Sequence, residues 1–306
     1  MALNLEVDSK QVKSQKATDD SIVKPKTHSD SLDSTLSSTG SSKTRSPGAP
    51  VPAAKTQISN VVIFGGTGVG KSSLVNMLAG DPALAETSSS VHRVTFGSQC
   101  YRVQLGKPAK EFALWDTQGL DGDVGEDEVS TEALIKLGQL IIQLRDSGGV
   151  SLLIYCIMGG RNSRSLATNH DLFHGILCRA EVPMLVVVTK LENDTPMDSW
   201  WSKNEETLRI NRLFHESYVC VTTTRGREKP DGYVFQAEYD TSRVKVESSI
   251  VNLVLSVPWM PREEAAVWAK DVEKRVRGYL TAVGGKKKKM LYRAPTDDVA
   301  CNCIIQ

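Results

Sequence analysis

The sequence predicts an α/β fold built on a doubly wound, mostly parallel sheet. From residue 59 to about 256, short apolar segments alternate with longer segments of helical periodicity. Two of the short segments, Phe112–Trp115 and Met184–Val188, are continuously apolar, as strands buried on both faces of a sheet are. A glycine-rich turn after Val61–Phe64 leads straight into a segment with helical spacing, which adds a strand–turn–helix unit.

Each element is expected from its own local pattern. The strands are expected where apolar and β-branched residues run up to a turn: 60–64, 92–96, 100–105, 111–116, 150–157, 183–189 and 218–222. The helices are expected where apolar residues recur three and four positions apart: about 70–79, 128–147, 165–180, 198–214, 236–256 and 261–282. The acidic, glycine-rich segment 121–127 fits neither pattern, and we expect a mobile loop there.

The last expected helix follows Pro258 and Pro261 and has two different sides. Its apolar face is formed by Ala265, Ala266, Trp268, Val272, Val276 and Leu280. Its other faces carry Lys270, Lys274, Arg275 and Arg277. The pattern therefore indicates a helix that packs with one face and leaves its basic side chains outside.

Composition divides the chain into four parts. Residues 1–56 are rich in Ser, Thr, Lys and Asp, with too few apolar residues to offset the cost of ordering, so we expect a disordered arm. A folded domain is expected over 57–257, a C-terminal helix over 258–283 and a basic tail over 284–306. No apolar run reaches the length of a membrane span, and the polar start has no signal-peptide core, so we expect a cytoplasmic protein.

Charge and cysteine content narrow the class of protein. The net charge of +1 argues against general nucleic-acid binding, and no nucleic-acid partner is expected. Of the six cysteines, Cys156 and Cys220 lie in apolar strands, and none has the spacing of a zinc site. We expect neither a disulfide framework nor a structural metal.

The segment 65–72 reads Gly-Gly-Thr-Gly-Val-Gly-Lys-Ser, a complete Gly-x4-Gly-Lys-Ser loop between a strand and a helix. Such a loop turns backbone N–H groups toward the phosphates of a nucleoside triphosphate. Lys71 places a charge near the β- and γ-phosphates, and the Ser72 hydroxyl reaches a magnesium ion. The expected nucleotide-binding residues here are Gly65, Gly66, Thr67, Gly68, Val69, Gly70, Lys71, Ser72 and Ser73.

A second motif, Asp116-Thr117-Gln118-Gly119, ends an apolar strand. We expect Asp116 to support Mg²⁺ through water and the N–H of Gly119 to meet the γ-phosphate. The contact would exist only while the third phosphate is present, so the motif and the loop after it would report the nucleotide state.

Between the two motifs, a threonine is expected to coordinate magnesium in the triphosphate state. Thr95 is our choice over Thr87 and the run 88–90, although a threonine in a strand is often only a β-former. The expected magnesium ligands are thus Ser72, Thr95 and Asp116. The residues expected to act in catalysis are Lys71, Thr95 and Gly119.

The base-recognition signal is Thr189-Lys190-Leu191-Glu192. Guanine offers paired N–H donors that suit one carboxylate, and a lysine stem can lie over the purine ring. The usual form, Asn/Thr-Lys-x-Asp, has an aspartate where this chain has Glu192. Three alternatives stay open: Glu192 bends back to the base, Asp194 takes the role, or guanine selectivity is weaker. Thr224, after the last strand, is expected to contribute a backbone N–H.

Hydrolysis is expected to be slow. Leu120 occupies the position after Asp-x-x-Gly where a water-positioning glutamine is common, and Gln118 lies inside the motif instead. The positive charge that neutralises the leaving phosphate could be supplied in trans, and Arg161 and Arg164 are candidates for it. Solvated surface arginines are the more ordinary interpretation of these two residues.

The tail carries a separate signal. Cys303-Ile304-Ile305-Gln306 fits the farnesylation pattern, with Cys301 available for acylation and Lys286–Lys289 able to meet anionic lipid. One prenyl chain alone binds reversibly, so a second signal matters. We expect a peripheral protein on a cytoplasmic membrane face.

Through 65–76, 116–119 and 189–192 the chain resembles the translation-factor-related GTPases, in the septin, Toc and immune-associated nucleotide-binding branch. It is also similar to G-domain proteins of basidiomycete fungi, through 114–120, Leu172–His174 and Asp198–Trp201. The resemblance covers about 59–256. It implies a P-loop G domain that binds GTP and Mg²⁺, and dimerisation across the nucleotide face with a hydrophobic residue at 120.

The sequence thus predicts a GTP-binding switch with slow hydrolysis, stimulated by a partner or a second copy. A nucleotide-dependent membrane scaffold that does not hydrolyse GTP is one alternative. An ATPase, favoured only by the imperfect base motif, is the other.

Overall fold

The computed structural model describes residues 58–85, 98–120, 131–160, 165–210 and 213–282. The chain divides into two units, Met1–Ala53 and Ala54–Gln306, and every described residue belongs to the second. Four predicted segments lie outside the described residues: the arm, the strand at 92–96, the loop at 121–127 and the basic tail.

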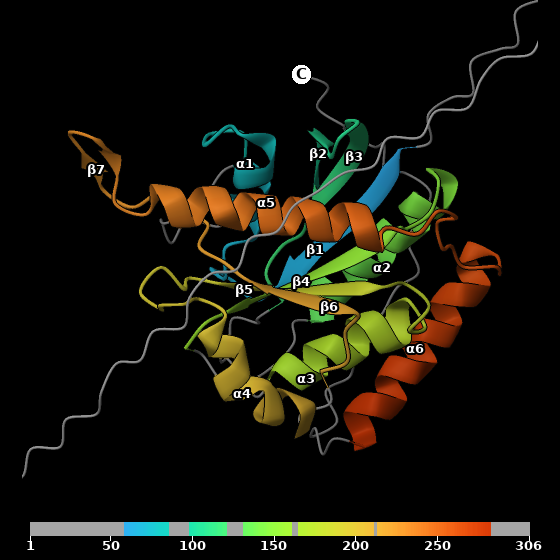
Figure 1. Cartoon of the computed structure of the whole chain (residues 1–306). Coiled ribbons are helices and arrows are strands. Elements are labelled where there is room, and N and C mark those ends of the chain that lie inside the picture. Colours follow the sequence, from blue (N-terminus) through green and yellow to red (C-terminus); the bar gives the residue numbers. More distant parts are fainter. Residues whose placement is uncertain (1–57, 86–97, 121–130, 161–164, 211–212, 283–306) are drawn as a thin grey trace, which may run out of the picture. The chain divides into compact units, whose positions relative to one another are not determined.

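Within the described ranges, six strands form one sheet in the order β2-β3-β1-β4-β5-β6 (Figure 1). The strands are β1 (Ser59–Gly65), β2 (Gln99–Leu105), β3 (Lys110–Asp116), β4 (Leu152–Met158), β5 (Met184–Thr189) and β6 (Ser217–Cys220). All neighbours pair in parallel except β2, which runs antiparallel to β3. The mostly parallel, doubly wound sheet is confirmed.

Helices cover both faces of this sheet (Figure 1). They are α1 (Lys71–Ala79), α2 (Thr131–Asp146), α3 (Ser165–His170), the π-helix η1 (Asp171–Leu177), α4 (Ser199–Ile210), α5 (Gln236–Leu253) and α6 (Ala265–Ala282). Helices α1 and α5 contribute to one apolar cluster, and α2, η1, α4 and α6 to the other. In the described part of the chain, no helix combines the length and apolarity that a membrane span requires.

The central strands are apolar throughout because both of their faces are covered. Successive side chains of a strand point to opposite sides of the sheet. In β4, Leu153 and Tyr155 enter the cluster with α2 and α6, whereas Ile154 and Cys156 enter the cluster with α1 and α5. All four side chains are fully buried.

Two local features differ from the prediction. The helix expected over 165–180 is α-helical only to His170 and continues as the π-helix. A short hairpin, β7 (Glu228–Lys229) and β8 (Gly232–Tyr233), was missed, because two-residue polar strands show no alternation of apolar and polar residues.

Helix α6 packs into the cluster formed by α2, η1 and the sheet. Trp268, Val272 and Val276 are buried, as the pattern predicted, whereas Ala266 is exposed. At the start of α6, Arg179 contacts Glu263 at 2.7 Å and Asp271 at 3.2 Å. Because Arg179 follows η1, α6 begins beside the end of that helix.

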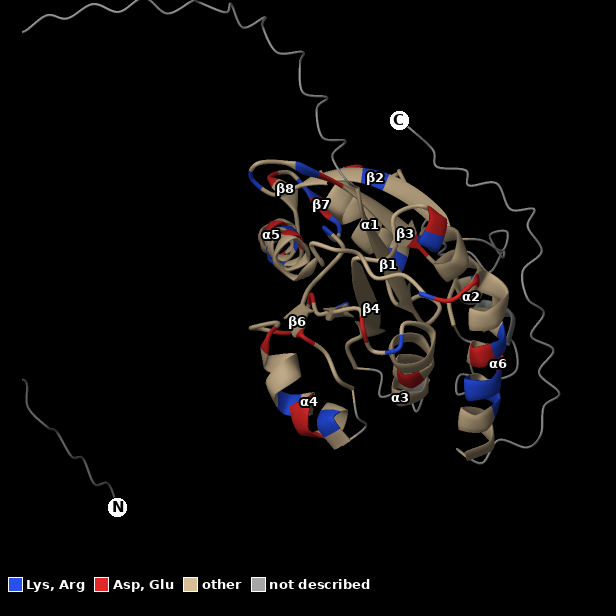
Figure 2. Cartoon of the chain, turned by 90° about the vertical axis from the view of Figure 1, so that its right-hand side faces the viewer, with Lys and Arg blue, Asp and Glu red and all other residues tan. Residues whose placement is uncertain are grey.

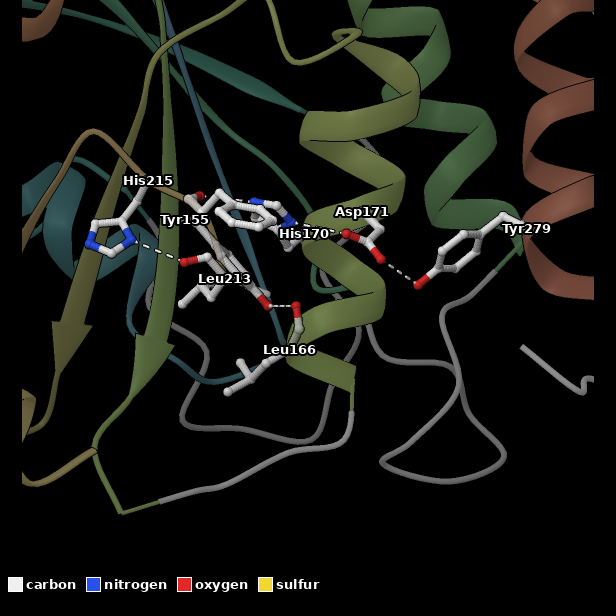
Figure 3. Close-up of polar contacts among 8 residues, drawn as sticks. Tyr155, Leu166, His170, Asp171, Leu213, His215 and Tyr279 are labelled. Atoms are coloured by element: carbon white, nitrogen blue, oxygen red, sulfur yellow. Dashed lines mark hydrogen bonds and ion pairs between the residues drawn. The ribbon is translucent and has the colours of Figure 1, made fainter. Parts of the chain in front are cut away.

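A chain of polar contacts joins α6 to the junction of α3 and η1 (Figure 3). The hydroxyl of Tyr279 donates to Asp171 Oδ2 at 2.9 Å, and Asp171 Oδ1 lies 3.2 Å from His170 Nδ1. The Nε2 of His170 donates to the carbonyl oxygen of Phe214 at 2.9 Å. Near its end α6 therefore lies beside the start of η1, so the two helices are antiparallel.

The tryptophans of α4 and α6 are buried in the core. Trp201 is 1% exposed and stacks on Tyr218 with ring centroids 3.9 Å apart, and Trp200 is 9% exposed. The pair at 200–201 therefore contributes to packing. Trp268 of α6 is fully buried.

His174, in the π-helix, is a buried histidine with a shifted pKa. Its Nε2 donates to the carbonyl of Val182 at 3.0 Å. Burial lowers the pKa of His174 below its ordinary value of 6.5, and nearby His170 lowers it further. Glu216, Asp171 and the bond to Val182 oppose this shift but do not reverse it.

We expect the free energy of unfolding to fall as pH drops below about 6.5, because the unfolded chain then binds a proton that folded His174 resists. Above that pH the neutral imidazole is common to both states, and this loss is absent. Urea unfolding of wild type and His174→Gln at pH ~7.5 and ~5.5 checks this, and the variant should lose less stability on acidification. Equal losses in the two proteins would contradict the assignment.

Candidate functional site

The carboxyl end of β1 passes into a loop that only glycine can form. Gly65 has φ +149°, and a Cβ there would lie 2.2 Å from the carbonyl oxygen of Cys156 in β4. Gly68 and Gly70 have φ of 70° and 99°, in the left-handed region. Gly70 caps α1 without a side-chain hydrogen bond, so the first-turn N–H groups of α1 are not covered by a cap.

Lys71, the first residue of α1, holds its ammonium inside this loop. Its side chain is 7% exposed, and Nζ donates to the carbonyls of Gly65 at 3.1 Å and Gly66 at 2.7 Å. A positive charge and the amino end of a helix thus lie at one point, which is how proteins bind phosphate.

Ser72 and Asp116 meet beside this loop. The Ser72 hydroxyl donates to Asp116 Oδ2 at 2.6 Å, while the buried Oδ1 has no hydrogen-bond partner among the described residues. Burial raises the pKa of Asp116, although the bond from Ser72 and the charge of Lys71 offset part of the shift. A hydroxyl and a carboxylate with an unpaired oxygen are hard oxygen donors, so these residues fit a divalent cation such as Mg²⁺.

This pair is not a cation cage on its own. Within the described ranges, no group of three or more His, Cys, Asp or Glu side chains lies close enough together to hold a metal. Magnesium commonly keeps several waters and takes further oxygens from a bound phosphate, so two protein oxygens suit it.

The segment after β3 lies tightly against the loop. Thr117 donates to the carbonyl of Ile63 through both its N–H, at 3.2 Å, and its hydroxyl, at 2.8 Å. The N–H of Leu120 donates to the carbonyl of Gly65 at 3.2 Å. A Cβ on Gly119 would lie 2.1 Å from Thr67 Oγ1 and 2.7 Å from Thr67 Cα. Glycine is therefore required where the two motifs touch.

Leu120, in the position where a catalytic glutamine was considered, is 1% exposed and belongs to the core cluster that holds α2. Gln118 is exposed. The described structure thus places an apolar anchor, rather than a water-positioning amide, directly after Gly119.

Thr189 lies at the end of β5 and is fully buried. Its hydroxyl donates to the carbonyl of Val69 in the loop and lies 3.2 Å from the carbonyl oxygen of Ile157. The side chain expected to read the base instead joins β5 to the phosphate-loop backbone. Lys190 follows with φ 61° and an exposed side chain.

Glu192 belongs to a small network with the end of β6. The hydroxyl of buried Thr222 lies 3.4 Å from Glu192 Oε2, and the N–H of Thr224 donates to Thr222 Oγ1 at 3.3 Å. For Asp194 only a backbone bond, from its N–H to the carbonyl of Leu191 at 3.0 Å, is seen in the described part. Thr222 was missed, because nothing in Val221–Thr224 shows which threonine faces the carboxylate.

The residues predicted to bind the base and those predicted to bind the phosphates converge at one edge of the sheet. A Cβ on Gly70 would lie 3.5 Å from Thr223 Oγ1 and 3.6 Å from Thr189 Oγ1. The structure therefore brings together the predicted residues of 65–73, 116–119, 189–192 and 224. Thr95, Arg161, Arg164, Cys301 and Cys303 lie outside the described residues.

The fold and the two loops define a P-loop G domain, the fold of GTPases. Residues 60–190 match the family described as "50S ribosome-binding GTPase". No curated protein sequence matches the chain.

Solved structures of GTPases resemble the chain distantly. Toc33 from Arabidopsis thaliana, in complex with GDP and Mg²⁺, is 16% identical with TM-score 0.42, over 66% of this chain and 88% of that one. Era from Aquifex aeolicus, bound to GDP and AlF4⁻, is 15% identical with TM-score 0.44, over 68% of this chain and 61% of that one.

Elongation factor SelB from Methanococcus maripaludis, in complex with a GTP analogue, is 13% identical with TM-score 0.42, over 65% of this chain. The matched region spans only 34% of the SelB chain and 61% of the Era chain.

Gly119→Ala tests the contact between the two motifs. The added methyl group must push the loop at Thr67 away, and overpacking of this kind costs roughly 1–3 kcal/mol of unfolding free energy. Chemical denaturation without nucleotide measures the cost. The control is Gly278→Ala in α6, where a Cβ meets nothing within 4 Å, and where alanine should be neutral or stabilise by up to ~1 kcal/mol. Comparable stability in the two variants would show that the contact is not tight.

Proposed function

We propose that this chain is a GTP-binding switch that hydrolyses GTP slowly to GDP and phosphate. The observation that carries the proposal is the meeting of Lys71, the uncapped start of α1 and the Ser72–Asp116 pair at the end of β1. This grouping provides what a triphosphate with its cation requires: N–H donors, an ammonium and hard oxygen ligands.

On binding nucleotide, Lys71 would exchange its backbone carbonyl partners for phosphate oxygens. The bonds that Lys71 makes to the carbonyls of Gly65 and Gly66 hold its ammonium at the centre of the loop. Phosphate oxygens are stronger acceptors than these carbonyls because they are charged. Ser72 and Asp116 would hold Mg²⁺, which neutralises the charge that develops on the phosphates. Thr95 is proposed as a further magnesium ligand.

Gly119 would report the third phosphate. Its segment is already hydrogen-bonded to β1 through Thr117 and Leu120, so it lies close to the loop. An N–H at Gly119 that meets the γ-phosphate would bias the chain that follows toward one arrangement, and loss of the phosphate would release it.

For the base, the network around Thr222 supports Glu192 rather than Asp194. The Thr222 hydroxyl lies 3.4 Å from Glu192 Oε2 and 3.2 Å from the carbonyl oxygen of Thr224, so the carboxylate, one methylene longer than the usual aspartate, lies beside the 222–224 turn. The same hydroxyl accepts the N–H of Thr224, so the carboxylate and the 222–224 turn would be positioned as one unit. Lys190, exposed at the strand end, would cover the purine ring.

Hydrolysis would need help from outside the domain. Buried Leu120 cannot orient a water, and exposed Gln118 makes no side-chain contact that fixes it within the described structure. We therefore propose that a partner, or a second copy that pairs across the nucleotide face, stimulates the reaction. This behaviour fits the septin, Toc and immune-associated branch that the sequence resembles.

Attachment to a cytoplasmic membrane face is part of the proposal. It is supported by the Cys303 lipidation motif, by Cys301 and by the basic run Lys286–Lys289. A scaffold that binds GTP at the membrane without hydrolysing it is the second candidate, favoured by the burial of Leu120.

Replacing Glu192 tests base recognition. Glu192→Ala should weaken GTP binding roughly 10- to 100-fold, because paired guanine N–H donors lose a charged acceptor. Glu192→Asp should retain or tighten it, and Asp194→Ala is the matched control that should leave it unchanged. Calorimetry with GTP and with ATP measures the affinities. Tighter ATP binding than GTP binding by the wild-type chain would favour the ATPase alternative.

Single-turnover hydrolysis tests the mode of catalysis. The rate should rise with protein concentration, because a second copy completes a site that lacks its own water-positioning group. Lys71→Ala should abolish nucleotide binding and serves as the control. If GTP remains intact at every concentration and no hydrolysis follows, the scaffold interpretation is correct.

A further inference from the structure

The most exposed charged side chains of α6 are all basic. Lys270, Lys274, Arg275 and Arg277 are the charged side chains that this helix exposes, and all four are basic. Lys270, Lys274 and Arg277 recur at spacings of four and three residues, so they form one line along the helix. Figure 2 shows blue Lys and Arg segments along α6, with red acidic segments between them.

The acidic residues of α6 are used in ion pairs. Asp271 lies 3.2 Å from Arg179 and 2.8 Å from Arg275, and Glu273 pairs with Arg277. Both acidic residues are only partly exposed. Neither Lys270 nor Lys274 has an ion pair with any described residue, so their charge is not compensated within this part of the structure.

The inner face of α6 fixes the direction in which these lysines point. Trp268 is fully buried, and Val272 and Val276 are 1% and 3% exposed. Arg179 holds the start of the helix and Asp171 holds Tyr279 near its end. These contacts hold α6 in one orientation, with the basic line on the side away from the core.

We propose that this basic face of α6 rests on an anionic lipid surface. The proposal depends on the membrane attachment proposed above and adds an orientation to it. Charge complementarity supports it, and so does continuity, because Lys286–Lys289 follow α6 by only a few residues. Val267, 54% exposed, lies in the same line and offers an apolar contact at the level of the head groups.

Nucleic acid suits this surface less well. Single-stranded RNA is usually bound with aromatic side chains that stack on bases, and the aromatic residues of α6 are turned inward: Trp268 is buried and Tyr279 is bonded to Asp171. One line of basic residues on one helix instead suits a flat surface of dispersed negative charge.

The test uses the full chain and vesicles of phosphatidylcholine with or without phosphatidylserine. The double variant Lys270→Gln/Lys274→Gln should bind the anionic vesicles roughly 20- to 30-fold more weakly than wild type. The matched control is Lys203→Gln/Lys229→Gln, which removes two exposed lysines from α4 and β7. It should bind within about twofold of wild type, because surface charges far from the membrane are screened.

Circular dichroism and nucleotide affinity should be unchanged in both double variants, which shows that they fold. A tail variant, with all of Lys286–Lys289 changed to Gln, separates the inference from its premise. If the tail variant loses binding while the α6 variant binds like wild type, the tail alone attaches the chain and the role of α6 is overturned.

Two other outcomes also overturn the inference. If the wild-type chain does not bind anionic vesicles, both the attachment and the role of α6 fail. If the α6 variant loses binding to a polyuridylate RNA but not to vesicles, the basic face is a nucleic-acid site instead.

Discussion

The phosphate-loop site depends on close packing of the loop after β1 against the carboxyl ends of the neighbouring parallel strands. Strands β1, β3, β4 and β5 all end at the same edge of the sheet, and the loop after β1 must fit between its neighbours. The fit leaves no room for a side chain at Gly65, which lies against the carbonyl of Cys156, or at Gly119, which lies against Thr67. The phosphate-binding geometry is thus a consequence of backbone packing, and the charged residues act within that frame.

This packing also joins the two halves of the site. The buried hydroxyl of Thr189 holds the loop at Val69, while the next turn of chain carries Lys190 and Glu192 toward the base side. A buried carbonyl that lost this donor would remain unsatisfied, at a cost of about 1–3 kcal/mol. Thr189 therefore holds the loop against the segment that carries Lys190 and Glu192.

Local motifs could be predicted from sequence, whereas contacts between distant segments could not. The 65–72 loop is one stretch of backbone in which Gly65, Gly68 and Gly70 adopt positive φ, so the sequence shows it directly. The contact of Glu192 with Thr222 joins residues 30 positions apart, and three successive threonines offer no way to choose between them. The π-helix was missed for another reason: the apolar spacing of 165–180 suits an α-helix equally well, so the pattern does not show the widened turn at Asp171–Leu177.

Helix α6 shares its apolar core with the rest of the domain, although the sequence predicts it as a separate part. The sequence predicts a boundary near 257, yet Trp268 lies in one apolar cluster with Leu140 and Leu144 of α2, so the core continues across that point. A helix held by a buried indole and by Arg179 at its start has one fixed outer face. Helix α6 packs in the same apolar cluster as α2, η1 and Leu120. This cluster therefore sets the direction of the basic line on α6 and also holds Leu120 directly after Gly119. The orientation of the outer face of α6 and the position of the Asp116–Gly119 motif therefore depend on the same apolar core.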